Sequence, residues 1–175
     1  MSIEKRLFEQ SSRYLVLFLT LRYDDAYRDD VTLRTIQRHR DIFMRRIDGA
    51  QDGVLGKIQA CIWKLEEGQE AGLHLHCLLF FSGRHRADTY YAERIGDYWV
   101  DIVTRGWGDY WNSNTDKQKA KHERRYGSCL GQVDAADEGK RSILRRFASE
   151  YLTKQTQVPT DRGDRDRTWG VRFFS

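Results

Sequence analysis

The sequence predicts an α+β fold in which helices pack on a central antiparallel β-sheet. Three observations support this expectation: a continuous apolar run near the N-terminus, two strand-like segments joined by a short turn, and apolar residues at helical spacing before and after them. The chain has 175 residues, a length typical of one domain. Residues 1–175 are therefore expected to form a single domain.

The first two predicted elements are a strand and a helix. Tyr14–Leu21 (YLVLFLTL) is an apolar run with β-branched and aromatic residues, which is typical of a central strand covered on both faces. A helix is expected from about Val31 to Ile47. The apolar residues that recur there at helical spacing are Leu33, Ile36, Phe43, Met44 and Ile47.

A hairpin is expected next. Lys57–Glu66 is predicted to be the second strand and Gly72–Phe81 the third. The EGQEAG segment between them is a short turn that contains glycine. Two strands joined by so short a connection pair in the antiparallel sense.

The middle of the chain has a weaker pattern. Thr89–Asn112 is rich in Tyr and Trp and is predicted to form one or two helices, interrupted near Gly106 and Gly108. Ser113–Tyr126 is highly charged, and it is predicted to be a mobile loop or a solvent-exposed helix. An arm that contacts nucleic acid is the alternative for this segment, although charge runs are usually solvated.

The C-terminal part is predicted to supply two strands and a helix. Ser128–Val133 is a candidate fourth strand, and Thr168–Phe174 (TWGVRFF) is the final one. Lys140–Gln155 is expected to be a helix that ends before Pro159. The apolar residues on one side of that helix are Ile143, Leu144, Phe147 and Leu152.

The composition limits the classes of function. Lys and Arg number 30 against 26 Asp and Glu, a net charge of +4 that is compatible with a polyanionic partner. No apolar stretch approaches the length of a membrane span, and the N-terminal MSIEKRLFEQ lacks the apolar segment of a secretory signal. Cys61, Cys77 and Cys129 form no CxxC pair, so we expect buried free thiols in a reducing, cytoplasmic compartment.

The most informative motif is His74-Leu75-His76 in the third predicted strand. Residues i and i+2 of a strand point to the same face, so the two imidazoles form half of a metal site. Glu66, at the end of the preceding strand, is the preferred third ligand, and Glu67 and Glu70 are alternatives. Two imidazoles and one carboxylate suit Mn²⁺ or Mg²⁺ with open coordination positions.

The last long helix carries a second candidate group. Tyr151 and Lys154 have i,i+3 spacing and are expected to share one helix face. Arg145 and Arg146 precede them, and this positive field is expected to attract a phosphate and to favour the phenolate of Tyr151. The alternative is that Tyr151 is an ordinary packing residue of an amphipathic helix.

Together these motifs resemble the ordered signature of the HUH superfamily of endonucleases. The order is the apolar strand Leu15–Leu21, then His74-Leu75-His76, then Tyr151-x-x-Lys154. Within that superfamily the chain is most similar to the rolling-circle replication initiators (Rep proteins) of bacterial phages and plasmids. Filamentous-phage and prophage initiators are similar also in the Trp63–Glu66 segment and in the C-terminal RTWGVRFF.

The resemblance implies an RRM-like sheet core and a nuclease that nicks and rejoins single-stranded DNA, initiating rolling-circle replication of a phage or plasmid. Tyr151 would form a covalent 5′-phosphotyrosine with help from Lys154, and His74, His76 and Glu66 would bind Mn²⁺ or Mg²⁺. Phe147 and Gln155 occupy the positions four residues away from Tyr151, which implies a single-tyrosine enzyme.

Two alternatives accompany this expectation. Single-tyrosine transposases of the superfamily carry a metal-binding Gln four residues after the tyrosine, so Gln155 is the alternative third ligand and a transposase-like protein an alternative function. The other alternative is a catalytically silent DNA-binding domain of the same fold.

The resemblance also implies partners. The substrate would be single-stranded DNA in the cytoplasm of a bacterial host, with an origin hairpin as its source. Basic residues that flank the predicted sheet strands or precede the tyrosine are candidate DNA contacts: Arg22, Arg84, His85, Arg86, Arg145 and Arg146. Gly139-Lys140-Arg141-Ser142 lacks the first glycine of a P-loop, so a host helicase would be required besides a host polymerase.

Overall fold

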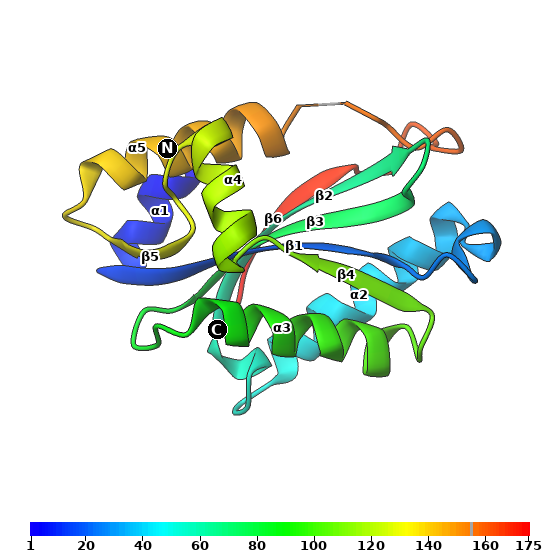
Figure 1. Cartoon of the computed structure of the whole chain (residues 1–175), viewed down its shortest axis with the longest axis horizontal. Coiled ribbons are helices and arrows are strands. Elements are labelled where there is room, and N and C mark those ends of the chain that lie inside the picture. The colour runs from blue at the N-terminus through cyan, green and yellow to red at the C-terminus, as the bar shows by residue number, and fades with distance from the viewer. Residues whose placement is uncertain (155) are drawn as a thin grey trace.

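The computed structural model describes residues 1–154 and 156–175, and it is built around one antiparallel sheet with the strand order β4-β1-β3-β2-β6 (Figure 1). A further strand, β5, pairs with β1 at the end opposite to β4. The strands are β1 (Arg13–Tyr23), β2 (Ile58–Gly68), β3 (Gly72–Ser82), β4 (Gly108–Asn112), β5 (Gly131–Asp134) and β6 (Trp169–Phe173).

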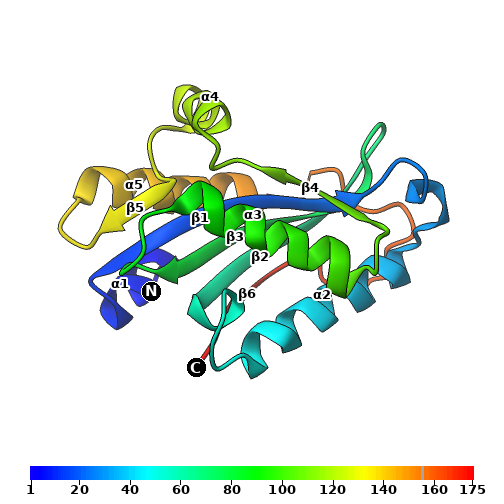
Figure 2. The same cartoon turned by 60° about the horizontal axis from the view of Figure 1, so that its bottom comes forward.

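Helices cover both faces of this sheet (Figures 1 and 2). The α-helices are α1 (Ile3–Gln10), α2 (Leu33–Gly49), α3 (Asp88–Tyr98), α4 (Asp116–Tyr126) and α5 (Glu138–Arg146). Two π-helical segments continue α3 and α5, namely η3 (Trp99–Val103) and η4 (Phe147–Leu152). Short 3₁₀ turns are η1 (Arg28–Asp30) and η2 (Leu55–Lys57). The α+β fold with an antiparallel sheet is confirmed.

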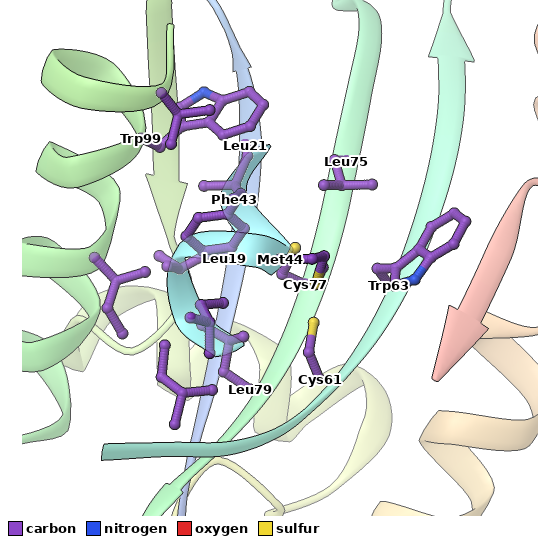
Figure 3. Close-up of a cluster of buried hydrophobic side chains, with 14 of the residues drawn as sticks. Leu19, Leu21, Phe43, Met44, Cys61, Trp63, Leu75, Cys77, Leu79 and Trp99 are labelled. Carbon is purple, nitrogen blue, oxygen red and sulfur yellow. The ribbon is translucent and has the colours of Figure 1, made fainter. Parts of the chain in front are cut away.

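Alternation along the strands separates two hydrophobic layers. Odd-numbered residues of β1 and β3, such as Leu19 and Cys77, face α2, α3 and η3 (Figure 3). Phe43 of α2 and Trp99 of η3 fill the centre of this layer and are fully buried. Burial of each large apolar side chain contributes roughly 1.5–3 kcal/mol, so this layer supplies much of the stability that holds the sheet flat against its helices.

The opposite face is covered by helices over only part of its length. Even-numbered strand residues such as Val16, Phe18 and Phe80 pack there against α1, α5 and η4. In Figure 1 these helices lie over one half of the sheet, and the end of the β2–β3 hairpin extends beyond them. Polar residues of β2 and β3 near the hairpin therefore lie next to the edge of the helical layer.

The prediction of one or two helices over 89–112, interrupted near Gly106 and Gly108, is wrong for the residues after the interruption. The helix ends in η3, the chain reverses at Arg105 and Gly106, which both have positive φ, and Gly108–Asn112 forms β4. This strand pairs with Leu19–Tyr23 of β1. Its five residues are too few to show an alternating pattern in the sequence, because that pattern needs several repeats to be recognised.

The charged segment 113–126 forms a helix, one of its two predicted forms. Thr115 caps α4 by accepting a hydrogen bond from the backbone N–H of Gln118, and Gly127, with a φ of 95°, ends it. Most of its side chains are exposed, but His122 is buried against Phe18 and Phe147. Among the described residues, neither ring nitrogen of His122 has a hydrogen-bond partner.

The remaining boundaries agree with the sequence to within a few residues. The strand predicted for 128–133 is β5, and α1 is an element that the sequence did not indicate. Cys61, Cys77 and Cys129 are buried free thiols, as predicted. In the described part of the chain, no helix combines the length and the apolar character needed to cross a membrane.

Candidate metal centre and tyrosine site

The register of the β2–β3 hairpin brings His74, His76 and Glu66 together. Glu66 pairs directly with His74, and His76 pairs with Lys64 two residues along each strand. Directly paired residues of an antiparallel sheet point to the same face, so all four side chains project from the face that carries η4. One ligand atom from each of Glu66, His74 and His76 lies within 4.8 Å of the other two.

Both imidazoles are held from behind through Nδ1. His74 Nδ1 lies 2.9 Å from the carbonyl oxygen of Gly72, and His76 Nδ1 lies 3.0 Å from the hydroxyl of Thr20. A carbonyl oxygen only accepts, so Nδ1 of His74 donates a hydrogen bond, and Nε2 is the ring nitrogen that faces Glu66. This support from behind is the arrangement that metal-binding histidines use to fix ring orientation.

Glu66 receives contacts on both carboxylate oxygens. Its Oε2 lies 3.0 Å from His76 Nε2 and 3.4 Å from His74 Nε2. Burial of Glu66 raises its pKa, but hydrogen bonds from His74, His76 and Lys64 outweigh that effect and the net pKa is lowered. Burial lowers the pKa of His76, which favours the neutral, metal-binding form of the ring.

These three residues fit a divalent cation. Nε2 of His74 and Nε2 of His76 converge on Oε2 of Glu66, and loss of the Nε2 protons would let both rings and the carboxylate bind one cation. Two imidazoles and one carboxylate leave coordination positions for other oxygen ligands. The described residues therefore bring together three buried groups that could hold a divalent ion.

The alternative third ligands lie elsewhere or outside the described residues. The carboxylate of Glu67 accepts hydrogen bonds from the backbone N–H and the hydroxyl of Thr160. Glu70 lies in the hairpin turn, where its carbonyl oxygen accepts from Arg28. Gln155 falls outside the described residues, so its proposed role as a ligand remains a prediction.

Lys64 is a site residue that the sequence analysis missed. Its ammonium lies 2.5 Å from Oε1 of Glu66, 2.9 Å from the hydroxyl of Thr156 and 3.1 Å from the carbonyl oxygen of Tyr151. Only 2% of Lys64 is exposed. A signal was present in the sequence, since Lys64 and Glu66 have i,i+2 spacing in an otherwise apolar strand and so share the face of the histidines.

Tyr151 lies beside the histidines, on the π-helical segment η4. Its ring packs edge-on against His76 with centroids 5.9 Å apart, and it stacks on Phe147 at 5.1 Å. The ammonium of Lys64 is 5.3 Å from the ring centre. His76 and Tyr151, which are far apart in the sequence, are thus in contact between the sheet and its helical layer.

The electrostatic expectation for Tyr151 is wrong for the protein without a metal ion. Burial raises the pKa of Tyr151 to about 12, and the charge of Glu66 and the hydroxyl of Tyr126 add to this effect. Arg125 lowers the pKa but does not outweigh burial. Arg145 has another role, because it pairs with Glu4 and Glu138.

A cleft of about 600 Å³ opens beside Tyr151 and Glu66. Three of its lining residues, Arg125, Arg146 and Lys154, are exposed cations. Lys154 lies beyond the end of η4, so the prediction that it shares a helix face with Tyr151 is wrong, although both residues line this cleft. Arg125 comes from α4, a segment that was expected to be solvated, with a nucleic-acid contact as the alternative.

The other predicted basic residues lie at different distances from the cleft. Arg22 is on β1, two residues after Thr20 and on the same face, where it pairs with Asp109 at 2.8 Å. Arg84 and Arg86 follow the far end of β3, roughly 20 Å along the strand from His76. His85 is in the same turn and contacts the hydroxyl of Tyr91. Arg84, His85 and Arg86 are therefore not brought to the candidate metal centre.

Comparison with known proteins gives one structural likeness. No protein-family model matches the chain, and no curated protein matches its sequence. Among solved structures, the chain is similar to the catalytic domain of the Adeno Associated Virus type 5 Rep protein, at 14% sequence identity and a TM-score of 0.36. The likeness covers 79% of this chain and 97% of that domain.

Proposed function

We propose that this protein is a metal-dependent endonuclease that cleaves single-stranded DNA through a covalent bond to Tyr151. The observation that carries the proposal is the contact between the rings of Tyr151 and His76, because His76 is one of three groups that can bind a divalent ion. The ordered motifs of the sequence, which resemble those of HUH endonucleases, support the same chemistry.

His74, His76 and Glu66 are the proposed ligands of Mn²⁺ or Mg²⁺. A divalent ion held there would polarise the scissile phosphate as a Lewis acid. The Tyr151 hydroxyl oxygen attacks phosphorus, a new P–O bond forms, and the bond from phosphorus to the 3′ oxygen breaks. The tyrosine proton leaves and the departing 3′ oxygen gains a proton, so a 5′-phosphotyrosine and a free 3′-hydroxyl result, and the reverse reaction joins ends.

The cleft cations complete the proposed site. Arg125, Arg146 and Lys154 line the same cleft as Tyr151, and they would bind the phosphates next to the scissile bond. A burial-raised pKa makes Tyr151 a weak nucleophile on its own. Positive charge next to the bound phosphate would therefore be needed to favour loss of the tyrosine proton.

The proposed biological role is initiation of rolling-circle replication of a bacterial phage or plasmid, in the cytoplasm and with a host helicase and polymerase. The support for this role is the resemblance of the sequence motifs to bacterial initiators, with residues 1–175 acting as one domain. A transposase-like protein and a silent DNA-binding domain are the competing roles.

A covalent adduct tests the chemistry. The protein is incubated with Mn²⁺ and single-stranded oligonucleotides that include hairpins, and the products are separated under denaturing conditions. We expect a protein–DNA adduct that disappears in Tyr151→Phe and on chelation of the metal. Tyr126→Phe is the matched control, because Tyr126 lines the same cleft and its ring packs 5.2 Å from that of Tyr151. An adduct that survives in Tyr151→Phe would assign the nucleophile to another residue.

The ligand assignment has its own test, which does not depend on DNA. Glu66→Gln and Gln155→Ala are compared for Mn²⁺ affinity by titration calorimetry, with Glu67→Gln as the control. We expect Glu66→Gln to abolish binding and the control to retain it, since Glu67 is engaged by Thr160. Loss of binding in Gln155→Ala alone would make Gln155 the third ligand.

A further inference from the structure

A row of directly paired residues, one from each of five neighbouring strands, crosses the sheet and passes through the candidate metal centre. Trp111 of β4 pairs with Thr20 of β1, and Thr20 pairs with His76 of β3. On the other side, His76 pairs with Lys64 of β2, and Lys64 pairs with Trp169 of β6. Directly paired residues share a face, so both tryptophans project from the face that carries the metal centre.

The two ends of this row are exposed, whereas its centre is buried. Trp111 is 43% exposed and Trp169 is 37% exposed, while His76 and Lys64 are almost completely buried. Each tryptophan is two strands away from β3, which corresponds to about 10 Å on either side of His76. Two large aromatic rings are thus available to a ligand at similar distances on the two sides of the site.

Basic side chains accompany both tryptophans. The guanidinium of Arg22 lies 5.7 Å from the ring centre of Trp111. Trp169 lines a hollow of about 490 Å³ together with Arg162 and Arg167, although Asp164 and Asp166 also border it. Aromatic rings combined with arginines are the usual elements of surfaces that bind single-stranded nucleic acid, where the ring stacks on a base and the cation contacts a phosphate.

We propose that Trp111 and Trp169 are base-stacking platforms on opposite sides of the metal centre, and that single-stranded DNA crosses the strands from one to the other. The proposal rests on the function proposed above and specifies how the substrate is held. A base that stacks on either ring must leave its own stack and partner, so the arrangement selects single-stranded over duplex DNA. A strand fixed at both rings would pass the cleft beside Tyr151 and Glu66, which would bring one phosphate near the candidate metal centre.

The proposal is tested by combining tryptophan variants with DNA that lacks bases. Affinity for a short mixed-sequence oligonucleotide and for an abasic oligonucleotide of the same length is measured by fluorescence anisotropy. Tyr151→Phe with Mn²⁺ serves as the parent, since it cannot cleave. Loss of the bases removes stacking and leaves the phosphates. Trp111→Ala and Trp169→Ala are added singly and together, and Trp107→Ala is the matched control.

Trp107 is a suitable control because it is 36% exposed but lies off the row, in the turn before β4, where it stacks on Tyr27. We expect each row variant to weaken binding of normal DNA by roughly 5- to 150-fold, the range for one lost base stack. Binding of abasic DNA should change little. The control should leave both affinities unchanged, and Trp→Phe at either row position should restore part of the loss.

The outcomes separate this proposal from the proposed function. The ratio of the affinities for normal and abasic DNA is the quantity to compare. If this ratio is the same in Trp111→Ala, Trp169→Ala and Trp107→Ala, the stacking role of Trp111 and Trp169 is refuted, even if the Tyr151 adduct forms. If the adduct never forms but base-dependent binding requires Trp111 and Trp169, the nuclease is refuted and the platforms remain. A parent that binds normal and abasic DNA equally refutes the platforms without any tryptophan variant, so a variant that fails to fold does not rescue the proposal.

Discussion

The ammonium of Lys64 lies 2.5 Å from Oε1 of Glu66, although both side chains are buried. This ion pair leaves Oε2 of Glu66 free to face the two histidines. The same ammonium binds the carbonyl oxygen of Tyr151. One buried cation thus connects the candidate metal centre to the end of the helix that carries the tyrosine.

The first prediction concerns this ion pair. Lys64→Met keeps the aliphatic stem and removes the charge, so Glu66 loses its buried partner and the free energy of unfolding should fall by about 3–5 kcal/mol. Mn²⁺ should then stabilise the variant more than the parent, because the ion becomes the main counter-charge of Glu66. Urea denaturation with and without Mn²⁺ measures both effects. The control is Lys57→Met, whose ammonium contacts only a backbone carbonyl on the surface. Equal stabilisation of Lys64→Met and the parent by Mn²⁺ would refute the prediction.

The second prediction concerns stabilisation by metal. Mn²⁺ at a hundredfold excess over its dissociation constant should raise the free energy of unfolding of the parent by about 2.7 kcal/mol. His74→Ala removes one ligand and should lose this gain, whereas His85→Ala at the far end of β3 should keep it. Thermal melting across a metal titration is the measurement. An undiminished rise in the melting temperature of His74→Ala would exclude His74 as a ligand.

The third prediction concerns pH. Burial lowers the pKa of His122 to about 4 from an ordinary value of 6.5, and the charge of Glu123 and the nearby backbone of Gly127 offset only part of the shift. Between these values the unfolded chain binds more protons at this residue than the native chain does. The part of the stability that is linked to His122 is therefore fully present above pH 6.5 and is lost as the pH falls toward 4. His122→Leu should reduce this loss.

The same variant should also raise stability at neutral pH. The two ring nitrogens of His122 lack hydrogen-bond partners within the described residues, and such a buried polar group costs about 1–3 kcal/mol. Urea midpoints at pH 7.5 and pH 5 for the parent and His122→Leu measure both effects. Identical pH dependence in the two proteins would show that His122 is not the group that titrates.

The fourth prediction concerns the cleft cations. Arg125→Ala and Arg146→Ala should weaken binding of single-stranded DNA and lower the salt dependence of binding by about one unit of slope each. Arg84→Ala and Arg86→Ala are the comparison, since these residues lie at the far end of β3. Binding isotherms over a range of salt concentrations distinguish the two pairs. A larger effect of the second pair would place the DNA path at the other end of the sheet.

The sequence was sufficient to predict that Glu66, His74 and His76 come together, because all parts of this candidate site are local. His74 and His76 share a strand face by the two-residue period, and a short turn places Glu66 across from them. Lys64 follows from the same period but was overlooked, since lysines are rarely buried and are usually assigned to the surface. The core of β1, β2 and β3 was predictable for the same reason, as these strands are long and apolar.

The parts of the structure that the sequence did not predict depend on contacts between residues that are distant in the chain. Nothing in Gly108–Asn112 indicates that this segment pairs with β1. In so short a segment, the tyrosine and the tryptophan are compatible with either a helix or a strand. The change from α5 to the π-helical η4 is likewise set by packing of Phe147 and Leu152 on the sheet. This helical segment ends at Leu152, before Lys154, which the 3.6-residue period could not show.

The length of the β2–β3 turn has a consequence for sequence change. Gly72, with a φ of 66°, closes this turn and fixes Glu66 opposite His74. Insertion or deletion of one residue in the turn would shift the register, and one of the two strands would then present its apolar residues where its polar ones now lie. The sheet could recover by a bulge, but the three ligand atoms would no longer converge. Descendants of this chain can therefore vary the other residues of that turn more readily than Gly72, whereas an odd change in its length would cost them the candidate metal centre.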